Sequence, residues 1–243
     1  DKTRMIWVET PTNPLLGIAD IAALANLAHE VGALMVLDCI ASGAIWVDMG
    51  ETGVDVLISA PQKGWSAPPA AGLVMFSPEG LARLEATTSD SFALDLKKWR
   101  AIMKAYEDGG HAYHATLPTD SLLVLRDAMV ETREMGFEAA RAAQWDLGER
   151  VRAALAERGF ASVAAPGFAA PGVVVSHTTD TEIQSGRRFA ALGMQIAAGV
   201  PLQVGEGPDF RTFRLGLFGL DKLKDVEGTL ARLTGVLDRL GEG

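Results

Sequence analysis

The sequence has a single cysteine, Cys39, and a shortage of basic residues, with 22 Lys and Arg against 31 Asp and Glu. One cysteine excludes an intrachain disulfide and a thiolate-rich zinc site, and it is typical of a reducing compartment. A net charge of -9 without any Lys/Arg block argues against a nucleic-acid partner, because no basic surface is available for a phosphate backbone. We therefore expect a cytoplasmic protein.

Long hydrophobic runs are also missing. The longest uncharged stretch, residues 159–176, is interrupted by Pro166, Pro171 and three glycines, which a membrane-spanning helix of about 20 residues would hardly tolerate. The first residues carry no signal or transit pattern, and residues 5–8 already have the character of a strand, so we expect the chain to begin within a domain. Neither a membrane segment nor a targeting segment is predicted.

Apolar residues make up 48% of the chain, and their spacing predicts an α/β fold. Short continuous apolar runs are typical of strands covered on both faces, as in parallel sheets. Strands are expected at residues 5–8, 33–37, 54–58, 72–76, 173–175 and 212–217, and helices at 18–31, 92–106, 120–158 with a bend near Gly136, 181–192 and from an N-cap at Asp221 onward. We divide the chain near residue 118 into an α/β piece, 1–118, and a connecting helix with a smaller α+β unit, 119–243.

Two polar residues follow predicted strands, Asp38 directly and Lys63 after a short loop. Ligands of open α/β sheets gather at the carboxyl ends of strands, so both side chains are expected at one crevice. Lysine is the residue for Schiff-base chemistry, and the neighbours of Lys63 are mostly apolar or small. By themselves, an aspartate at a strand end is usually a cap and a loop lysine usually a solvated charge.

Four segments, which follow one another along the chain in the same order as in the family, resemble the class V pyridoxal-phosphate (PLP) aminotransferases of the alanine–glyoxylate and serine–glyoxylate type. Residues 59–73, SAPQKGWSAPPAAGL, are similar to the lysine segment of that family, and residues 36–42, VLDCIAS, to its Val-Asp-Ser-Val-Ala-Ser stretch. Residues 113–118, YHATLP, resemble its Tyr-His-x-Thr-x-Pro segment, and residues 213–219, FRLGLFG, its Arg-x-Gly-Leu-x-Gly segment.

The resemblance implies a PLP-dependent fold type I (aspartate-aminotransferase-like) architecture, with part of the large domain and an α+β small domain. Lys63 would form the Schiff base with PLP, Asp38 would meet the ring nitrogen, and Gln62 and Thr10 would contact the ring. Tyr113 and Thr116 would reach the PLP phosphate of the neighbouring subunit in a homodimer.

The same resemblance implies that Arg214 grips the substrate α-carboxylate with its bidentate fork. The expected activity is transfer of an amino group from alanine or serine to glyoxylate or a related 2-oxoacid. The upstream part of the family chain, which supplies the phosphate-binding helix N-terminus and an aromatic stacked on the ring, has no counterpart here.

Alternatives remain open. A class V lyase or cysteine desulfurase usually has His before the lysine, where this chain has Gln62, and a desulfurase needs a mobile cysteine. Residues 9–14, ETPTNP, also resemble a loop of the transsulfuration enzymes, whose lysine segment differs. The non-enzymatic alternative is that the chain is a fragment or a dimerisation scaffold without catalytic activity. His111 and His114 are too few for a metal site, so no metal is expected.

Overall fold

The structure is a computed structural model that describes residues 2–12, 17–203 and 205–241. Its first sheet has the strand order β1-β2-β3-β4, with β1, β2 and β3 parallel and β4 antiparallel to β3. The strands are β1 (Met5–Glu9), β2 (Leu34–Asp38), β3 (Val56–Ser59) and β4 (Leu73–Phe76). The four predicted strands of the first piece are therefore confirmed. Their shared sheet includes an antiparallel member, which the apolar runs did not predict.

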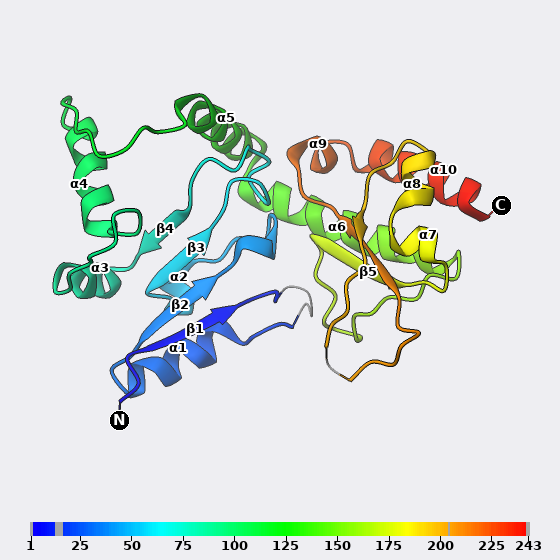
Figure 1. Ribbon diagram of the computed structural model, residues 1–243, viewed down its shortest axis with the longest axis horizontal. Helices are drawn as coiled ribbons and strands as arrows, with labels where there is room; N and C mark the ends of the chain where they lie inside the picture. Colours follow the sequence, from blue (N-terminus) through cyan, green and yellow to red (C-terminus); the bar gives the residue numbers. More distant parts are fainter. Residues whose placement is uncertain (1, 13–16, 204, 242–243) are drawn as a thin grey trace.

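Helix α1 (Ile21–Glu30) crosses from β1 to β2 and covers one face of this sheet (Figure 1). It begins at Asp20, whose carboxylate accepts a hydrogen bond from the Ala23 N–H, a frequent N-cap arrangement. Its buried side chains Ala25 and Ala28 pack with Met35 and Leu37 of β2. Burying both faces of β2 explains why that strand is an apolar run without alternation.

Four further helical segments lie in this part of the chain: η1 (Ile40–Ser42), α2 (Met49–Thr52), α3 (Pro78–Glu85) and α4 (Leu96–Glu107). In Figure 1, α3 and α4 lie on the β4 side of the sheet, away from the second sheet. Sequence periodicity indicated α4 and left the shorter three undetected, because three to eight residues carry too little repeat to show a helical face.

The second sheet is antiparallel, in the order β5-β7-β6, and consists of β5 (Val173–His177), β6 (Ala197–Ala198) and β7 (Thr212–Gly216). Strand β6 has only two small residues and was not predicted. The core beside this sheet joins Phe189 and Phe213, both fully buried, with leucines and valines of the helices α6 (Phe137–Ala156) and α10 (Val226–Gly241).

The long predicted helix is in fact two helices, α5 (Thr119–Met135) and α6, which meet at Gly136. Gly136 has φ of 91°, a left-handed conformation that favours glycine, so the predicted bend is confirmed. Leu125 and Ala128 of α5 pack against Ala67, whereas α6 packs in the core of the second sheet. The division near residue 118 is retained as a proposal.

Two predictions about helices near the C-terminus were wrong in detail. The helix expected at 181–192 is divided at Gly186, φ 80°, into α7 (Thr181–Gln184) and α8 (Arg187–Ala191). The closing helix does not begin at Asp221, which lies inside the short helix α9 (Leu220–Leu223). Asp225 instead accepts a hydrogen bond from the Gly228 N–H at the start of α10. The sequence analysis named Asp221 alone, because it did not resolve the short helix α9 that precedes α10.

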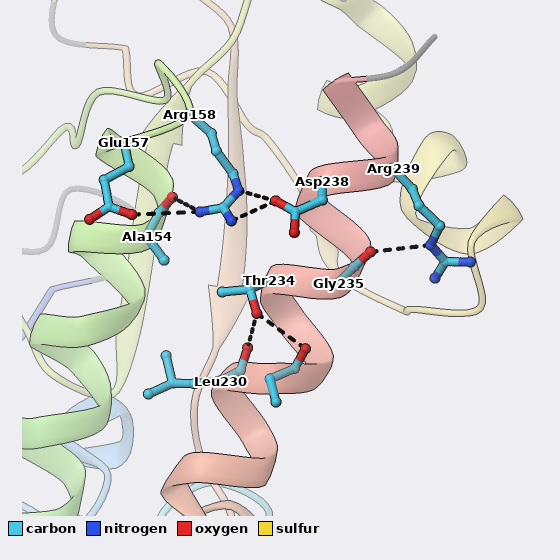
Figure 2. A network of polar contacts seen from close by, with 9 residues as sticks. Ala154, Glu157, Arg158, Leu230, Thr234, Gly235, Asp238 and Arg239 are labelled. Carbon is cyan, nitrogen blue, oxygen red and sulfur yellow. Dashed lines mark hydrogen bonds and ion pairs between the residues drawn. The ribbon is translucent and has the colours of Figure 1, made fainter.

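Helix α10 is joined to α6 by a polar network at the surface (Figure 2). Arg158, just after α6, donates from Nε and Nη2 to Asp238 of α10 at 2.8 and 2.6 Å, and from Nη1 to the Ala154 carbonyl at 2.9 Å. The apolar stripe of α10 faces the core, with Leu230, Leu233, Leu237 and Leu240 buried as predicted. In the described ranges no helix combines the length and apolar character needed to cross a bilayer.

Candidate active site

The carboxyl ends of β1, β2 and β3 meet at one edge of the first sheet. Glu9 is paired with Asp38, and Asp38 with Ile58. The ladder continues one step further, because the Thr10 N–H donates to the Asp38 carbonyl and the Cys39 N–H to the Ile58 carbonyl, both at 3.0 Å. A backbone hydrogen bond therefore joins Thr10, one residue beyond β1, to Asp38 at the end of β2.

Asp38 is half-buried, and one of its carboxylate oxygens, Oδ1, accepts from the Ile40 N–H at 3.1 Å. Within the described residues its second oxygen has no hydrogen-bond or ion-pair partner. Thr10 is buried, with 7% of its surface exposed, and its hydroxyl oxygen accepts from the Ala19 N–H at 3.1 Å. This edge of the sheet thus carries a half-buried carboxylate at the end of β2 and a buried hydroxyl just beyond β1.

Lys63 lies in the turn at residues 61–65 that follows β3. Hydrogen bonds from the Ser66 N–H to the Lys63 carbonyl and from the Ala67 N–H to the Pro61 carbonyl close this turn, at 3.1 and 3.0 Å. Its next residue, Gly64, lies so near the segment after β2 that a Cβ there would be 2.3 Å from the Gly43 carbonyl oxygen. The turn that carries Lys63 is consequently packed against the segment that follows β2, at Gly43.

The Lys63 amine lies 5.4 Å from the centroid of the Phe218 ring, beyond the end of β7. Throughout the described ranges, Lys63 has no carboxylate partner and donates no side-chain hydrogen bond. Its side chain is half-buried. An unpaired amine at the junction of the two sheets differs from the surface lysines Lys104 and Lys224, which form ion pairs with Asp108 and Glu131.

Arg214 occupies the middle of β7, paired with Val175 on one side and Ala197 on the other. Its Nε donates to the Ala198 carbonyl at 3.0 Å, and among the described residues no carboxylate pairs with it. The guanidinium therefore keeps donors for an anionic ligand. The sequence motif that contains Arg214 continues to Phe218, whose ring lies near the Lys63 amine.

The remaining candidates do not gather around Lys63 of the same chain. Gln62 is exposed at the start of the turn, and Tyr113 and Thr116 are exposed in the segment between α4 and α5, with Tyr113 at 81%. His114 is engaged by its neighbours instead: its Nε2 lies 2.9 Å from the Phe92 carbonyl, and its ring stacks near those of Phe92 and Trp99. Across the described residues, no group of three metal-ligating side chains is present.

Cys39 follows Asp38 directly and is 7% exposed. The pKa of its thiol is raised to about 11, mainly by burial and to a smaller extent by the neighbouring Asp38 carboxylate, while a hydrogen bond with Ser42 opposes the shift. A thiol with so high a pKa is not a nucleophile at neutral pH. A packing role for Cys39 agrees with this environment.

Two open cavities of about 490 and 470 Å³ lie around Phe210 in the smaller sheet region. Neither is lined by Lys63, Asp38 or Arg214. Size alone would favour them as binding sites, but the sheet edge combines an unpaired amine with an available carboxylate, and we give this chemistry more weight.

Sequence reasoning missed Phe218, Gly43 and Ser66 as parts of the site. Phe218 was visible only as a variable position in a motif. Ser66 accepts a hydrogen bond from the Leu220 N–H at 3.0 Å across the junction, and its φ of 56° gave no sequence signal because glycine is absent there. Contacts between segments so distant in the chain leave no local pattern.

The chain is similar to several known proteins. Residues 1–64 match a family model described as Cys/Met metabolism PLP-dependent enzyme. Over 226 residues the chain is 28% identical to the soluble hydrogenase small subunit of Synechococcus sp., covering 92% of this chain and 57% of that one. Over 225 residues it is 28% identical to 2-aminoethylphosphonate–pyruvate transaminase of Burkholderia ambifaria, covering 90% and 57%.

Among solved structures, alanine–glyoxylate aminotransferase from Nostoc sp. superposes with a TM-score of 0.81 at 18% identity, covering 97% of this chain and 61% of that chain. The chain thus spans less than two thirds of the length of these relatives. Its architecture is that of the PLP-dependent fold type I aminotransferases. The sequence relatives include a PLP-family model over the first residues and a transaminase, and the fold is shared with solved aminotransferases.

Proposed function

We propose that this chain carries the catalytic lysine of a PLP-dependent aminotransferase, which moves an amino group from a small amino donor to glyoxylate or a related 2-oxoacid. The supporting observation is the sheet edge itself. Lys63 has an amine without an ion-pair partner among the described residues, and its turn is packed through Gly64 against the segment that follows Asp38. A pyridine aldehyde such as PLP needs an amine that condenses with its aldehyde and a carboxylate that binds its ring nitrogen. Lys63 and Asp38 supply these two groups from neighbouring segments.

The residues present fit PLP. The uncommitted oxygen of Asp38 can accept a hydrogen bond from a protonated ring nitrogen, and Lys63 offers a primary amine that can condense with an aldehyde. The Thr10 hydroxyl accepts a bond from the Ala19 N–H and still has its own proton to donate to the cofactor. The exposed Gln62 side chain is available to the ring hydroxyl.

When bound, PLP supplies an electron-accepting ring that stabilises the negative charge left at the substrate Cα on loss of its proton. Lys63 Nζ is the base that we assign to this proton: it would take the proton from the substrate Cα and pass it on. Arg214 orients the donor by binding its carboxylate through the guanidinium donors that no carboxylate occupies in the described structure. The Asp38 carboxylate would hold the protonated ring nitrogen through a charge-assisted hydrogen bond.

The donor class follows from the resemblance and from the relatives. Alanine or serine is the donor that the alanine–glyoxylate and serine–glyoxylate resemblance implies. The relative from Burkholderia ambifaria is named for 2-aminoethylphosphonate and pyruvate. Arg214 could bind either a carboxylate or a phosphonate, since both present oxygens to its fork. Assays with alanine, serine and 2-aminoethylphosphonate as donors to glyoxylate and pyruvate distinguish these donors.

We include a homodimer in this proposal. Tyr113 and Thr116 are exposed, and among the described residues neither side chain contacts the candidate site of its own chain. Side chains that serve the neighbouring subunit are expected to be exposed in this way. No nucleic acid and no membrane are part of the proposal.

The decisive test replaces Lys63. Lys63→Ala should abolish both transamination and the visible absorbance band of lysine-bound PLP, because no other amine takes its position. The matched control is Lys104→Ala, an exposed lysine paired with Asp108, which should retain both properties. Absorbance after incubation with PLP, followed by borohydride reduction and peptide mapping, provides the measurement. A reducible PLP adduct persisting in Lys63→Ala would refute the assignment. A wild-type protein that folds and yet never binds PLP would favour the scaffold alternative.

A further inference from the structure

Phe218 is held in a slot between the two sheets. A Cβ added at Gly43 would lie 3.3 Å from Cδ1 and Cε1 of the Phe218 ring, and one added at Gly172 would lie 2.9 Å from Cε1. Any side chain at these positions would therefore crowd the ring. The absence of a Cβ at both positions creates the space that the ring occupies.

The backbone beside Phe218 is fixed by hydrogen bonds. The Leu217 N–H donates to the Gly172 carbonyl at 2.9 Å, and the side-chain amide of Gln144 donates to the Leu217 carbonyl at 3.3 Å and to the Pro171 carbonyl at 3.2 Å. Gln144 is 1% exposed, so these bonds are shielded from water. A ring on so firmly held a backbone has little freedom to move away.

The ring face is also where the Lys63 amine rests. The distance of 5.4 Å from Nζ to the ring centroid is within the range of about 6 Å for a cation–π contact. In the described residues no carboxylate pairs with Lys63, so the ring is the attractive partner that the structure gives to this positive charge. The amine is thereby held at the junction rather than extended into solvent.

We propose that Phe218 is a positioning residue of the transamination reaction: its ring would hold the ammonium group that Lys63 carries once it has taken the proton from the substrate Cα and before it passes that proton on. The proposal rests on the proposed function. A flexible four-carbon side chain must remain close to the substrate Cα to move its proton, and attraction to a fixed ring restricts the positions that it can take. Phe218 thus acts through Lys63.

The first test measures the amine directly and needs no cofactor. Wild type, Phe218→Leu, Phe218→Met and Phe218→Tyr are acetylated briefly with a limiting amine-reactive ester, and labelling of Lys63 is quantified by peptide mass spectrometry relative to exposed Lys104. Loss of the ring should raise labelling of Lys63 by about 2- to 5-fold in the Leu and Met variants, the factor that corresponds to a partly exposed cation–π contact. Tyr should restore the wild-type value.

Folding is checked in the same samples by circular dichroism and by labelling of Lys104. Two aliphatic variants of different shape guard against a single misfolded protein. Unchanged labelling of Lys63 in a folded Leu or Met variant overturns the proposal. Increased labelling in Phe218→Tyr equal to that in Phe218→Leu does so too, because it would show that the aromatic face is irrelevant.

The second test is kinetic. Phe218→Leu should lower kcat by about 2- to 5-fold and leave KM for the amino donor unchanged, because Arg214 and its carboxylate contact are intact. A raised KM with unchanged kcat would mean that the ring contacts substrate, and the proposal would be wrong. If wild type transaminates no donor, the proposed function fails, whereas the labelling comparison still decides whether the ring holds the amine.

Discussion

At the scale of single residues, the site depends on glycines at positions where a side chain would not fit. Gly64 touches the Gly43 carbonyl, and its conformation does not demand glycine; the requirement is space alone. Because backbone atoms at 2.3 Å cannot yield as a flexible side chain could, the turn that carries Lys63 must move if a methyl group is added.

We therefore predict that Gly64→Ala destabilises the protein by about 1 to 3 kcal/mol, the usual cost of overpacking. Gly72→Ala is the matched control in the same loop, since a Cβ there meets nothing within 4 Å, and it should change stability by less than about 0.5 kcal/mol. Urea denaturation followed by tryptophan fluorescence measures both. Equal midpoints for the two variants would show that the close approach does not constrain the turn.

At the scale of elements, Arg188 joins three helices near the C-terminus. Its Nη1 donates to Asp180, the N-cap of α7, at 2.9 Å, and its Nη2 to the Leu240 carbonyl in α10 at 2.7 Å, while Arg188 itself belongs to α8. The hydrogen bond from Arg188 lowers the pKa of Asp180, and the backbone N–H groups of Glu182 and Ile183 add to the effect. The sequence predicted one continuous helix here. In the structure the Arg188–Asp180 pair instead links the two separate helices α7 and α8.

This pair predicts a pH dependence. Because the folded-state pKa of Asp180 is depressed, its contribution to stability is present above the unfolded pKa and is lost as pH falls through the folded value. Asp180→Asn keeps the capping acceptor and removes the charge, so it should be less stable than wild type at neutral pH, by up to about 1 kcal/mol for a partly exposed pair.

The difference should vanish in acid, when wild-type Asp180 is protonated too. Thermal unfolding from neutral to acidic pH measures it, with Asp127→Asn, an exposed residue paired only with adjacent Arg126, as the control. A stability difference that stays constant down to acidic pH would assign the effect to packing instead of charge.

At the scale of the whole molecule, the proposed reaction requires the two sheets to meet. Lys63 and Asp38 come from the first sheet, and Arg214 and Phe218 from the strand β7 of the second and its continuation. The Trp46 indole N–H donates to the Phe137 carbonyl at the start of α6 at 3.0 Å, which adds a further link. A substrate held by Arg214 and acted on by Lys63 would therefore depend on the relative position of the two sheets.

The proposed dimer can be tested by complementation. If each site combines Lys63 of one subunit with Tyr113 of the other, Lys63→Ala and Tyr113→Ala proteins are each impaired. Mixed under conditions that exchange subunits, they should regain activity, up to about a quarter of the wild-type sites for random pairing into twofold dimers. Activity of the mixture is compared with that of each variant alone. No gain despite subunit exchange, seen by mass spectrometry, would mean that Tyr113 serves its own subunit.

The sequence by itself predicted the α/β fold, most of its longer elements and the candidate site residues. Apolar runs and helical repeats predicted four strands of the first sheet, α1 and the bend at Gly136, since burial of a strand or a helix face leaves its period in the local sequence. The identities of Lys63, Asp38 and Arg214 were likewise visible, because they stand in motifs of neighbouring residues.

Only the tertiary structure decided how these parts meet. It brought the Phe218 ring under the Lys63 amine, set Gly64 against Gly43, bonded Ser66 to Leu220 across 154 residues, and chose Asp225 over Asp221 as the cap of α10. The physical reason is that a contact between distant segments depends on the path of the whole chain, while hydrophobic period and capping chemistry report only on residues a few positions apart.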